Sequence, residues 1–162
     1  MINRQMSSIS AIWMSNERAT IEECSEKVLA FLTLLKKHNP HLFSKWYQKG
    51  KSKKDALLRE VSLDEKYVYD DILKNWDKKF DDLGARLSYW TGDQDGNKSV
   101  SISFNIGAYG TKTFNRNSCV LSLPKGNEYY DLRDNQEALI SLFDNFWKPG
   151  KLLVDGEEIL NK

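Results

Sequence analysis

The residues from Ser99 to Ala108 alternate between polar and apolar side chains, and this pattern constrains the fold more than any other in the chain. The apolar set is Val100, Ile102, Phe104, Ile106 and Ala108, and the polar set is Ser99, Ser101, Ser103 and Asn105. Successive side chains of a strand point to opposite faces of its sheet, so the alternation predicts a strand with one face in a hydrophobic core. Such a strand needs neighbouring strands and an apolar layer against its buried face.

Other segments provide both. Strand-like segments run over Ile9–Met14, Ala85–Trp90, Asn117–Leu123 and Leu152–Glu157, the last entering an Asp155-Gly156 turn. A capping box of Thr20 and Glu23 opens a helix, which should end near Lys37–His38 because Asn39-Pro40 disfavours its continuation. Two further helices are predicted for His41–Tyr47, which Gly50 should stop, and for Asn135–Trp147. Two more are predicted to open at capping boxes: a short one at Ser52 with Asp55, and a longer one at Ser62 with Glu65 that runs to about Phe80.

Most of the predicted helices lie in the first half of the chain, and most of the predicted strands lie in the second half. This order predicts an α+β fold, with an N-terminal strand and helices, then an antiparallel strand meander with a C-terminal helix packed on the sheet. A length of 162 residues suits one domain, which we expect to span residues 1–162.

Composition narrows the class of function. The net charge of +1, from 24 basic and 23 acidic side chains, argues against a dedicated nucleic-acid binder and against an overall DNA mimic. The first eight residues lack the apolar core of a secretory signal, and the apolar runs are too short to span a bilayer, so we expect a cytoplasmic protein. Cys24 and Cys119 are expected to be free and buried.

The sequence shows none of the residue patterns typical of a metal site, a catalytic nucleophile or a phosphate-binding loop. His38 and His41 flank Asn39-Pro40, which breaks the helical register that a metal pair would need. Asp93–Asn97 resembles a calcium loop, but its glycine falls fourth and its twelfth position is Phe104, so a hairpin turn is the better interpretation. There is no Gly-x-Ser-x-Gly elbow and no phosphate-binding glycine loop. We therefore predict no catalytic residue, no metal site and no cofactor.

One run of residues resembles a known family. The run is Trp46-Tyr47-Gln48-Lys49-Gly50-Lys51-Ser52-Lys53-Lys54-Asp55-Ala56-Leu57, and it is similar to a motif of the immunity protein 52 family of bacterial polymorphic toxin systems. Weaker similarities lie at Trp13, Glu22-Glu23-Cys24, Pro40, Leu83-Gly84, Trp90-Thr91-Gly92 and Asn117-Ser118. The motif residues that we assign mainly to the fold are Trp46, Tyr47, Lys49, Gly50, Ser52, Ala56 and Leu57.

The resemblance implies an α+β protein that neutralises a cognate toxin by direct binding. Toxins of such systems resemble restriction-endonuclease-fold nucleases and pass between competing bacteria by contact-dependent secretion, of which type VI secretion is one form. The partner expected from the resemblance is therefore a toxin protein. We expect the chain to bind neither a membrane nor nucleic acid directly, and to be a monomer or a homodimer.

The family contributes no binding residues, so the predicted toxin-facing residues come from exposure and charge. A nuclease groove is basic, and acidic side chains beside an aromatic residue would suit it. The predicted set is Trp90, Asp93 and Asp95 in one turn, and Asp70, Asp71 and Asp77 on the helix from Leu63 to Phe80. Two alternatives stay open: an adaptor or regulatory domain that binds another protein or a small ligand, and a nucleic-acid binder that uses the basic Lys45–Lys54 segment.

Overall fold

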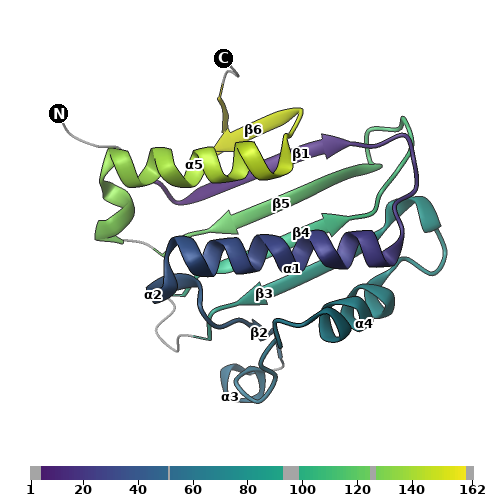
Figure 1. Cartoon of the computed structure of the whole chain (residues 1–162), viewed down its shortest axis with the longest axis horizontal. Coiled ribbons are helices and arrows are strands. Elements are labelled where there is room, and N and C mark those ends of the chain that lie inside the picture. The colour runs from purple at the N-terminus through teal and green to yellow at the C-terminus, as the bar shows by residue number, and fades with distance from the viewer. Residues whose placement is uncertain (1–4, 51, 93–98, 125–126, 160–162) are drawn as a thin grey trace.

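The described residues form a sheet of seven antiparallel strands (Figure 1). The computed structural model describes residues 5–50, 52–92, 99–124 and 127–159. Across the sheet the order is β2-β3-β4-β5-β1-β6-β7. The strands are β1 (Ser8–Met14), β2 (Tyr47–Gln48), β3 (Ala85–Trp90), β4 (Ser101–Ile106), β5 (Arg116–Ser122), β6 (Lys151–Val154) and β7 (Glu157–Glu158). The N-terminal strand β1 thus lies inside the sheet, between β5 and β6, while β3, β4 and β5 form the predicted meander.

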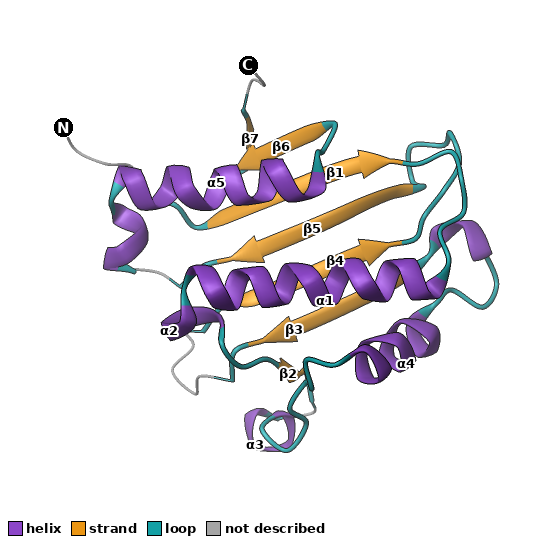
Figure 2. Ribbon diagram, in the orientation of Figure 1, coloured by secondary structure: helices purple, strands orange, loops and turns teal. Residues whose placement is uncertain are grey.

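The three longest helices lie on the same face of this sheet (Figure 2). They are α1 (Ile21–His38), α4 (Glu65–Asn75) and α5 (Arg133–Trp147). Shorter helices are α2 (Pro40–Phe43) and α3 (Lys53–Ala56), with 3₁₀ turns at η1 (Asp81–Leu83) and η2 (Glu128–Asp131). The predicted α+β class is confirmed, including the C-terminal helix packed on the sheet. None of the helices among the described residues is both long and apolar enough to cross a membrane.

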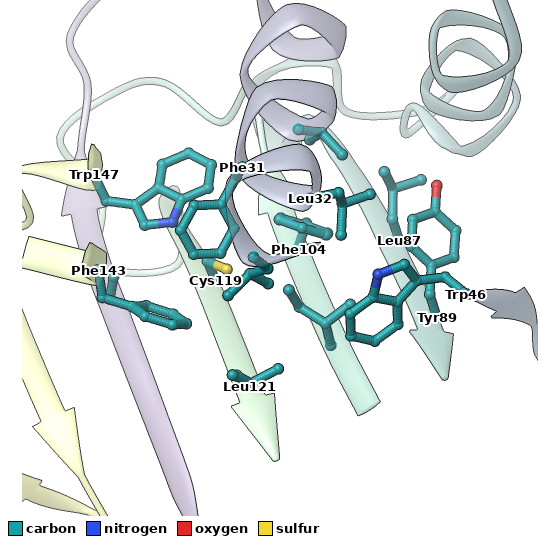
Figure 3. Packing of buried hydrophobic residues seen from close by; sticks show 14 of the residues in the cluster. Phe31, Leu32, Trp46, Leu87, Tyr89, Phe104, Cys119, Leu121, Phe143 and Trp147 are labelled. Atoms are coloured by element: carbon teal, nitrogen blue, oxygen red, sulfur yellow. The ribbon is translucent and has the colours of Figure 1, made fainter. Parts of the chain in front are cut away.

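The core lies between these helices and the sheet (Figure 3). Phe31 of α1 meets Phe143 and Trp147 of α5, with ring centroids 4.9 and 5.1 Å apart. Trp147 also stacks on Trp13 of β1 at 4.6 Å. Offset and edge-to-face aromatic pairs add to the stability that burial alone provides. Strand β1 near one end of the chain and α5 near the other are therefore joined through one aromatic cluster.

Two local signals in the sequence act as predicted. Thr20 accepts a hydrogen bond from the backbone N–H of Glu23 at 3.0 Å, and the Glu23 carboxylate accepts one from the Thr20 N–H at 2.9 Å, so the capping box opens α1. Asp155 and Gly156 adopt positive φ angles of 53° and 82° and form the turn between β6 and β7.

The predictions for residues 41 to 80 are wrong in detail. The helix expected over His41–Tyr47 ends at Phe43, and Tyr47 begins a strand instead. The helix expected from Ser62 to Phe80 begins at Glu65 and ends at Asn75. Its N-cap is Asp64, whose carboxylate accepts the Tyr67 N–H at 2.8 Å, so the pattern of Ser62 and Glu65 placed the start two residues early.

Candidate partner-binding surface

The aromatic residues of the family motif hold the edge of the sheet. Trp46 is fully buried and its ring is parallel to that of Phe43 at 6.2 Å. Tyr47 pairs with Trp90 as β2 joins β3. A Cβ atom on Gly92 would lie 2.5 Å from the Tyr47 ring, so the glycine lets the chain pass close to that side chain.

The rest of the motif builds the turn around α3. A Cβ on Gly50 would lie 2.9 Å from the backbone nitrogen of Ala56 and closer still to the Asp55 carboxylate. Gly50 is therefore needed for a close approach to α3, and it does not stop a preceding helix as predicted. The Ser52 hydroxyl accepts the Asp55 N–H at 3.1 Å, which confirms the predicted cap. Ala56 is buried, Leu57 is half-buried and Lys49 is exposed.

The three described aspartates of the predicted toxin-facing set have different surroundings. Asp70 is exposed on α4 and forms an ion pair with Lys66 at 2.9 Å. Asp71 points inward, where its carboxylate accepts hydrogen bonds from the Tyr89 hydroxyl and from Gln48 Nε2, the latter at 3.0 Å. Asp77 lies beyond the end of α4 and accepts the Phe80 N–H at 2.7 Å. The three carboxylates thus do not share one helix face.

Asp71 has this position because of helical spacing. It lies three residues after Val68, which is fully buried, so the two side chains lie on the same side of α4. Burial and the neighbouring Asp71 carboxylate raise the pKa of the Tyr89 hydroxyl, which stays a proton donor to that carboxylate. This pair ties α4 to β3.

Trp90 is half-buried at the end of β3, on the face of the sheet opposite the helices. Its indole Nε1 is buried and has no hydrogen-bond partner within the described structure. Asp93 and Asp95, predicted to lie beside it, fall outside the described residues. The predicted grouping of Trp90 with two carboxylates therefore stays a prediction.

The face that carries Trp90 is the most distinctive surface of the molecule. We call it the open face: the outward side of β1, β3, β4, β5 and β6, opposite α1, α4 and α5. Its side chains follow from the alternation that buries the inward set. They are Ser8, Ser10, Ile12 and Met14; Arg86, Ser88 and Trp90; Ser101, Ser103 and Asn105; Arg116, Ser118, Val120 and Ser122; Lys151 and Leu153.

Two arginines frame a groove of about 520 Å³ on the open face. Arg86 of β3 lies opposite Asn105 of β4, which in turn lies opposite Ser118 of β5. The Asn105 amide nitrogen donates to the backbone carbonyl of Arg116, the second arginine of the groove. Phe114, whose side chain is 62% exposed, completes the lining.

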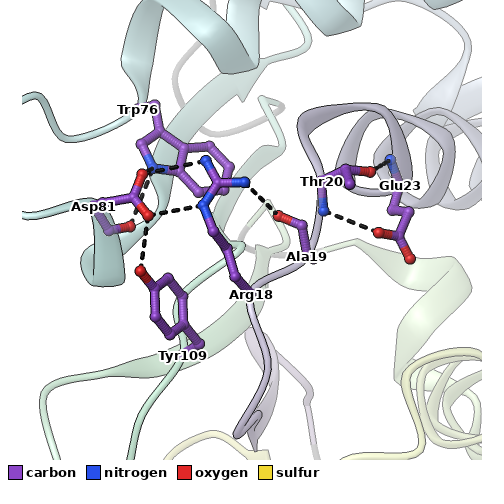
Figure 4. Close-up of polar contacts among 7 residues, drawn as sticks. All are labelled: Arg18, Ala19, Thr20, Glu23, Trp76, Asp81 and Tyr109. Carbon is purple, nitrogen blue, oxygen red and sulfur yellow. Dashed lines mark hydrogen bonds and ion pairs between the residues drawn. The ribbon is translucent and has the colours of Figure 1, made fainter.

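The connection that carries Phe114 is held by two carboxylates of η1, of which Figure 4 shows Asp81. Asp81 accepts hydrogen bonds from Arg18 Nε at 2.7 Å, from the Tyr109 hydroxyl at 2.8 Å and from Trp76 Nε1 at 3.0 Å. These donors, Arg18 first, lower the pKa of Asp81 to about 2. The neighbouring Asp82 carboxylate accepts the side-chain amide of Asn115 at 2.9 Å. The segment between β4 and β5 is thereby fixed at both ends.

Metal-ligating and nucleophilic side chains are scattered among the described residues. No cluster of three or more metal-ligating side chains occurs among them. The two cysteines are free and buried, as predicted, and burial raises the pKa of Cys24 to about 11 and that of Cys119 well above its ordinary value. Thiols with a raised pKa stay protonated and are poor nucleophiles. The open face carries arginine and tryptophan, which are enriched at protein–protein interfaces, and serine, which is common in antibody paratopes.

Comparison with known proteins identifies the family. The family model described as immunity protein 52 matches residues 8–130, well over half of the chain. The chain belongs to the immunity protein 52 family. The match covers the open-face strands β3, β4 and β5 and the motif around Gly50, but not α5 or β6. No curated protein matches this immunity protein.

The arginines of the groove were not predicted from the sequence. Arg86 and Arg116 are separated by 30 positions, and each is one outward residue in an alternating strand. A signal was present in the alternation itself, because a cation at an outward strand position next to serines marks an exposed face. Their juxtaposition depends on strand order, which the alternation does not specify.

Proposed function

We propose that this chain protects the cell that produces it by binding a cognate toxin and blocking its activity, without chemistry of its own. Membership in the immunity protein 52 family supports a toxin as the partner. The observation that carries a binding mechanism is the open face, a broad sheet surface of serine, arginine and aromatic side chains that none of the described helices covers. Such a surface can cover part of a toxin and exclude its substrate.

We propose further that the toxin is a nuclease with a restriction-endonuclease fold, and that neutralisation takes place in the cytoplasm. The resemblance of the Trp46–Leu57 motif supports the toxin class. Trp90 is proposed as a contact because it lies on the open face. Asp70 is proposed as a second contact, on α4, because it is exposed beside Lys66 and could meet the basic rim of a nuclease groove.

Co-expression tests this function. The toxin to use is the product of the gene that adjoins the gene for this chain. We expect the toxin alone to kill a bacterial host and degrade its DNA, and we expect an equimolar amount of this chain to restore both survival and intact DNA. Asp70→Lys should slow association with a basic groove. Continued DNA degradation in the presence of excess chain would refute the proposal.

A further inference from the structure

We infer that the groove between Arg86 and Arg116 binds a carboxylate from an acidic surface segment of the toxin. This inference rests on the proposed function, because it names the chemistry of the partner at the open face. It differs from the sequence-based prediction, which placed acidic residues of this chain against a basic groove of the toxin.

Charge on the open face is the first argument. Its outward positions on β1, β3, β4, β5 and β6 carry Arg86, Arg116 and Lys151, and none of these described positions carries an aspartate or glutamate. Among the residues that the structure describes, no carboxylate pairs with either guanidinium of the groove. A third cation stands at the rim, where the Lys112 ammonium lies 5.6 Å from the centre of the Phe114 ring. An acidic partner complements this field and is attracted by it at a distance.

The spacing of the two arginines is the second argument. They extend from β3 and β5, which flank the same strand β4, and neighbouring strands lie about 4.8 Å apart. The two backbones are therefore on the order of 10 Å apart. Long arginine side chains reach across that gap, and each guanidinium can donate two parallel hydrogen bonds to a carboxylate.

The floor of the groove supplies the third argument. Asn105 lies between the two arginines, and its Oδ1 atom is buried and accepts no hydrogen bond from any residue that the structure describes. That atom is too buried for a ligand to reach, but the hydroxyls of Ser88, Ser103 and Ser118 also line the groove and can accept an N–H group from a ligand. A peptide brings backbone N–H groups together with its carboxylates, whereas the phosphate backbone of DNA offers acceptors only. The groove therefore fits an acidic peptide segment better than a nucleic acid.

The rigid mounting of the groove is the fourth argument. Asn117 accepts the Ala108 N–H at 2.8 Å and donates to the Ala108 carbonyl at 3.0 Å, which closes the connection between β4 and β5. Asp81 and Asp82 hold the same connection from the side of η1. A groove wall that is ordered before binding loses less entropy when the partner arrives.

Charge reversal in the groove tests the inference. The variants are Arg86→Glu, Arg116→Glu and the pair together, and the matched control is Lys27→Glu, an exposed lysine of α1 on the other side of the sheet. Binding to the toxin encoded by the adjoining gene is measured by surface plasmon resonance at low and high salt. We expect each arginine reversal to raise Kd by about 30-fold or more and to remove most of the salt dependence of association. Lys27→Glu should change Kd less than about threefold.

The outcomes separate this inference from the proposed function. If the unaltered chain neither binds nor inhibits the toxin, both fail. If it inhibits and the arginine variants, folded as judged by circular dichroism, inhibit equally well, only the inference fails. A photoreactive residue in place of Ser103, which is exposed in the groove, should crosslink to a toxin peptide rich in Asp or Glu. Crosslinking to a basic peptide, or tight binding of the free chain to a DNA oligonucleotide through the same arginines, would also overturn it.

Discussion

Gly107 sits where α4, η1 and the end of β4 meet, and its replacement by alanine should destabilise the protein more than its backbone angle alone explains. Its φ angle is +83°, and an added Cβ would lie 2.4 Å from Cη2 and 2.8 Å from Cζ3 of Trp76. Trp76 has little room to move, because it is buried and its Nε1 donates to Asp81 at 3.0 Å. The substitution therefore combines backbone strain with overpacking.

The two contributions can be estimated separately. A non-glycine residue in the left-handed region costs about 1–2 kcal/mol. Forcing an extra methyl group into a packed core costs about 1–3 kcal/mol more. Gly156 provides the matched control, since its φ angle is +82° and an added Cβ would meet nothing within 4 Å. We expect Gly156→Ala to lower the free energy of unfolding by about 1–2 kcal/mol and Gly107→Ala by about 2–5 kcal/mol.

Urea denaturation at constant m-value measures both losses. In a Trp76→Leu background the clashing ring atoms are absent and the tight contact that remains is Cys24 Sγ, 3.2 Å from the added Cβ. The cost of Gly107→Ala should then fall close to that of Gly156→Ala. Equal losses from the two glycine variants in the presence of Trp76 would refute the steric argument. It would mean that the indole moves aside freely, and that Asp81 does not hold it.

Two further predictions concern the carboxylates that organise the fold. Asp81 has a pKa of about 2, below its ordinary 3.8, so its contribution to stability is present above pH 4 and is lost as the pH falls toward 2. The difference in urea midpoint between the unaltered chain and Asp81→Asn should therefore shrink over that range. A constant difference would contradict the assignment of the low pKa to Asp81. Tyr89→Phe removes the hydroxyl that donates to Asp71 and should lower the free energy of unfolding by about 1–3 kcal/mol, measured by urea denaturation. A neutral effect of Tyr89→Phe would show that its hydrogen bond to Asp71 does not stabilise the fold.

Local sequence patterns were reliable where one short segment contains both partners of an interaction. Thr20 and Glu23 form the capping box that they predict, and Asp155-Gly156 forms its turn. Patterns failed where two local solutions competed. Ser62 and Asp64 can both cap a helix, and Asp64 does so because its carboxylate reaches the Tyr67 N–H. Strand β2 has only two residues, too few to show any periodicity.

The predicted toxin-facing set illustrates a second kind of limit. Charge identifies a side chain as polar, but only packing decides whether it faces solvent. Asp71 is half-buried and binds Tyr89 and Gln48, while Asp70, one position earlier, is exposed. A rotation of 100° around a helix separates these two outcomes, and the sequence specifies that rotation only through the apolar residues on either side.

The alternation from Ser99 to Ala108 determined by itself that one side of this strand is apolar and the other polar, because that property depends only on neighbouring residues. It did not determine what would cover the polar side. The tertiary structure placed α1, α4 and α5 on the apolar side and, among the described residues, no helix on the other. It also placed β4 between β3 and β5, which brings Arg86 and Arg116 to one groove. Strand order depends on contacts between distant segments, so the surface that we propose as the binding site exists only in the folded chain.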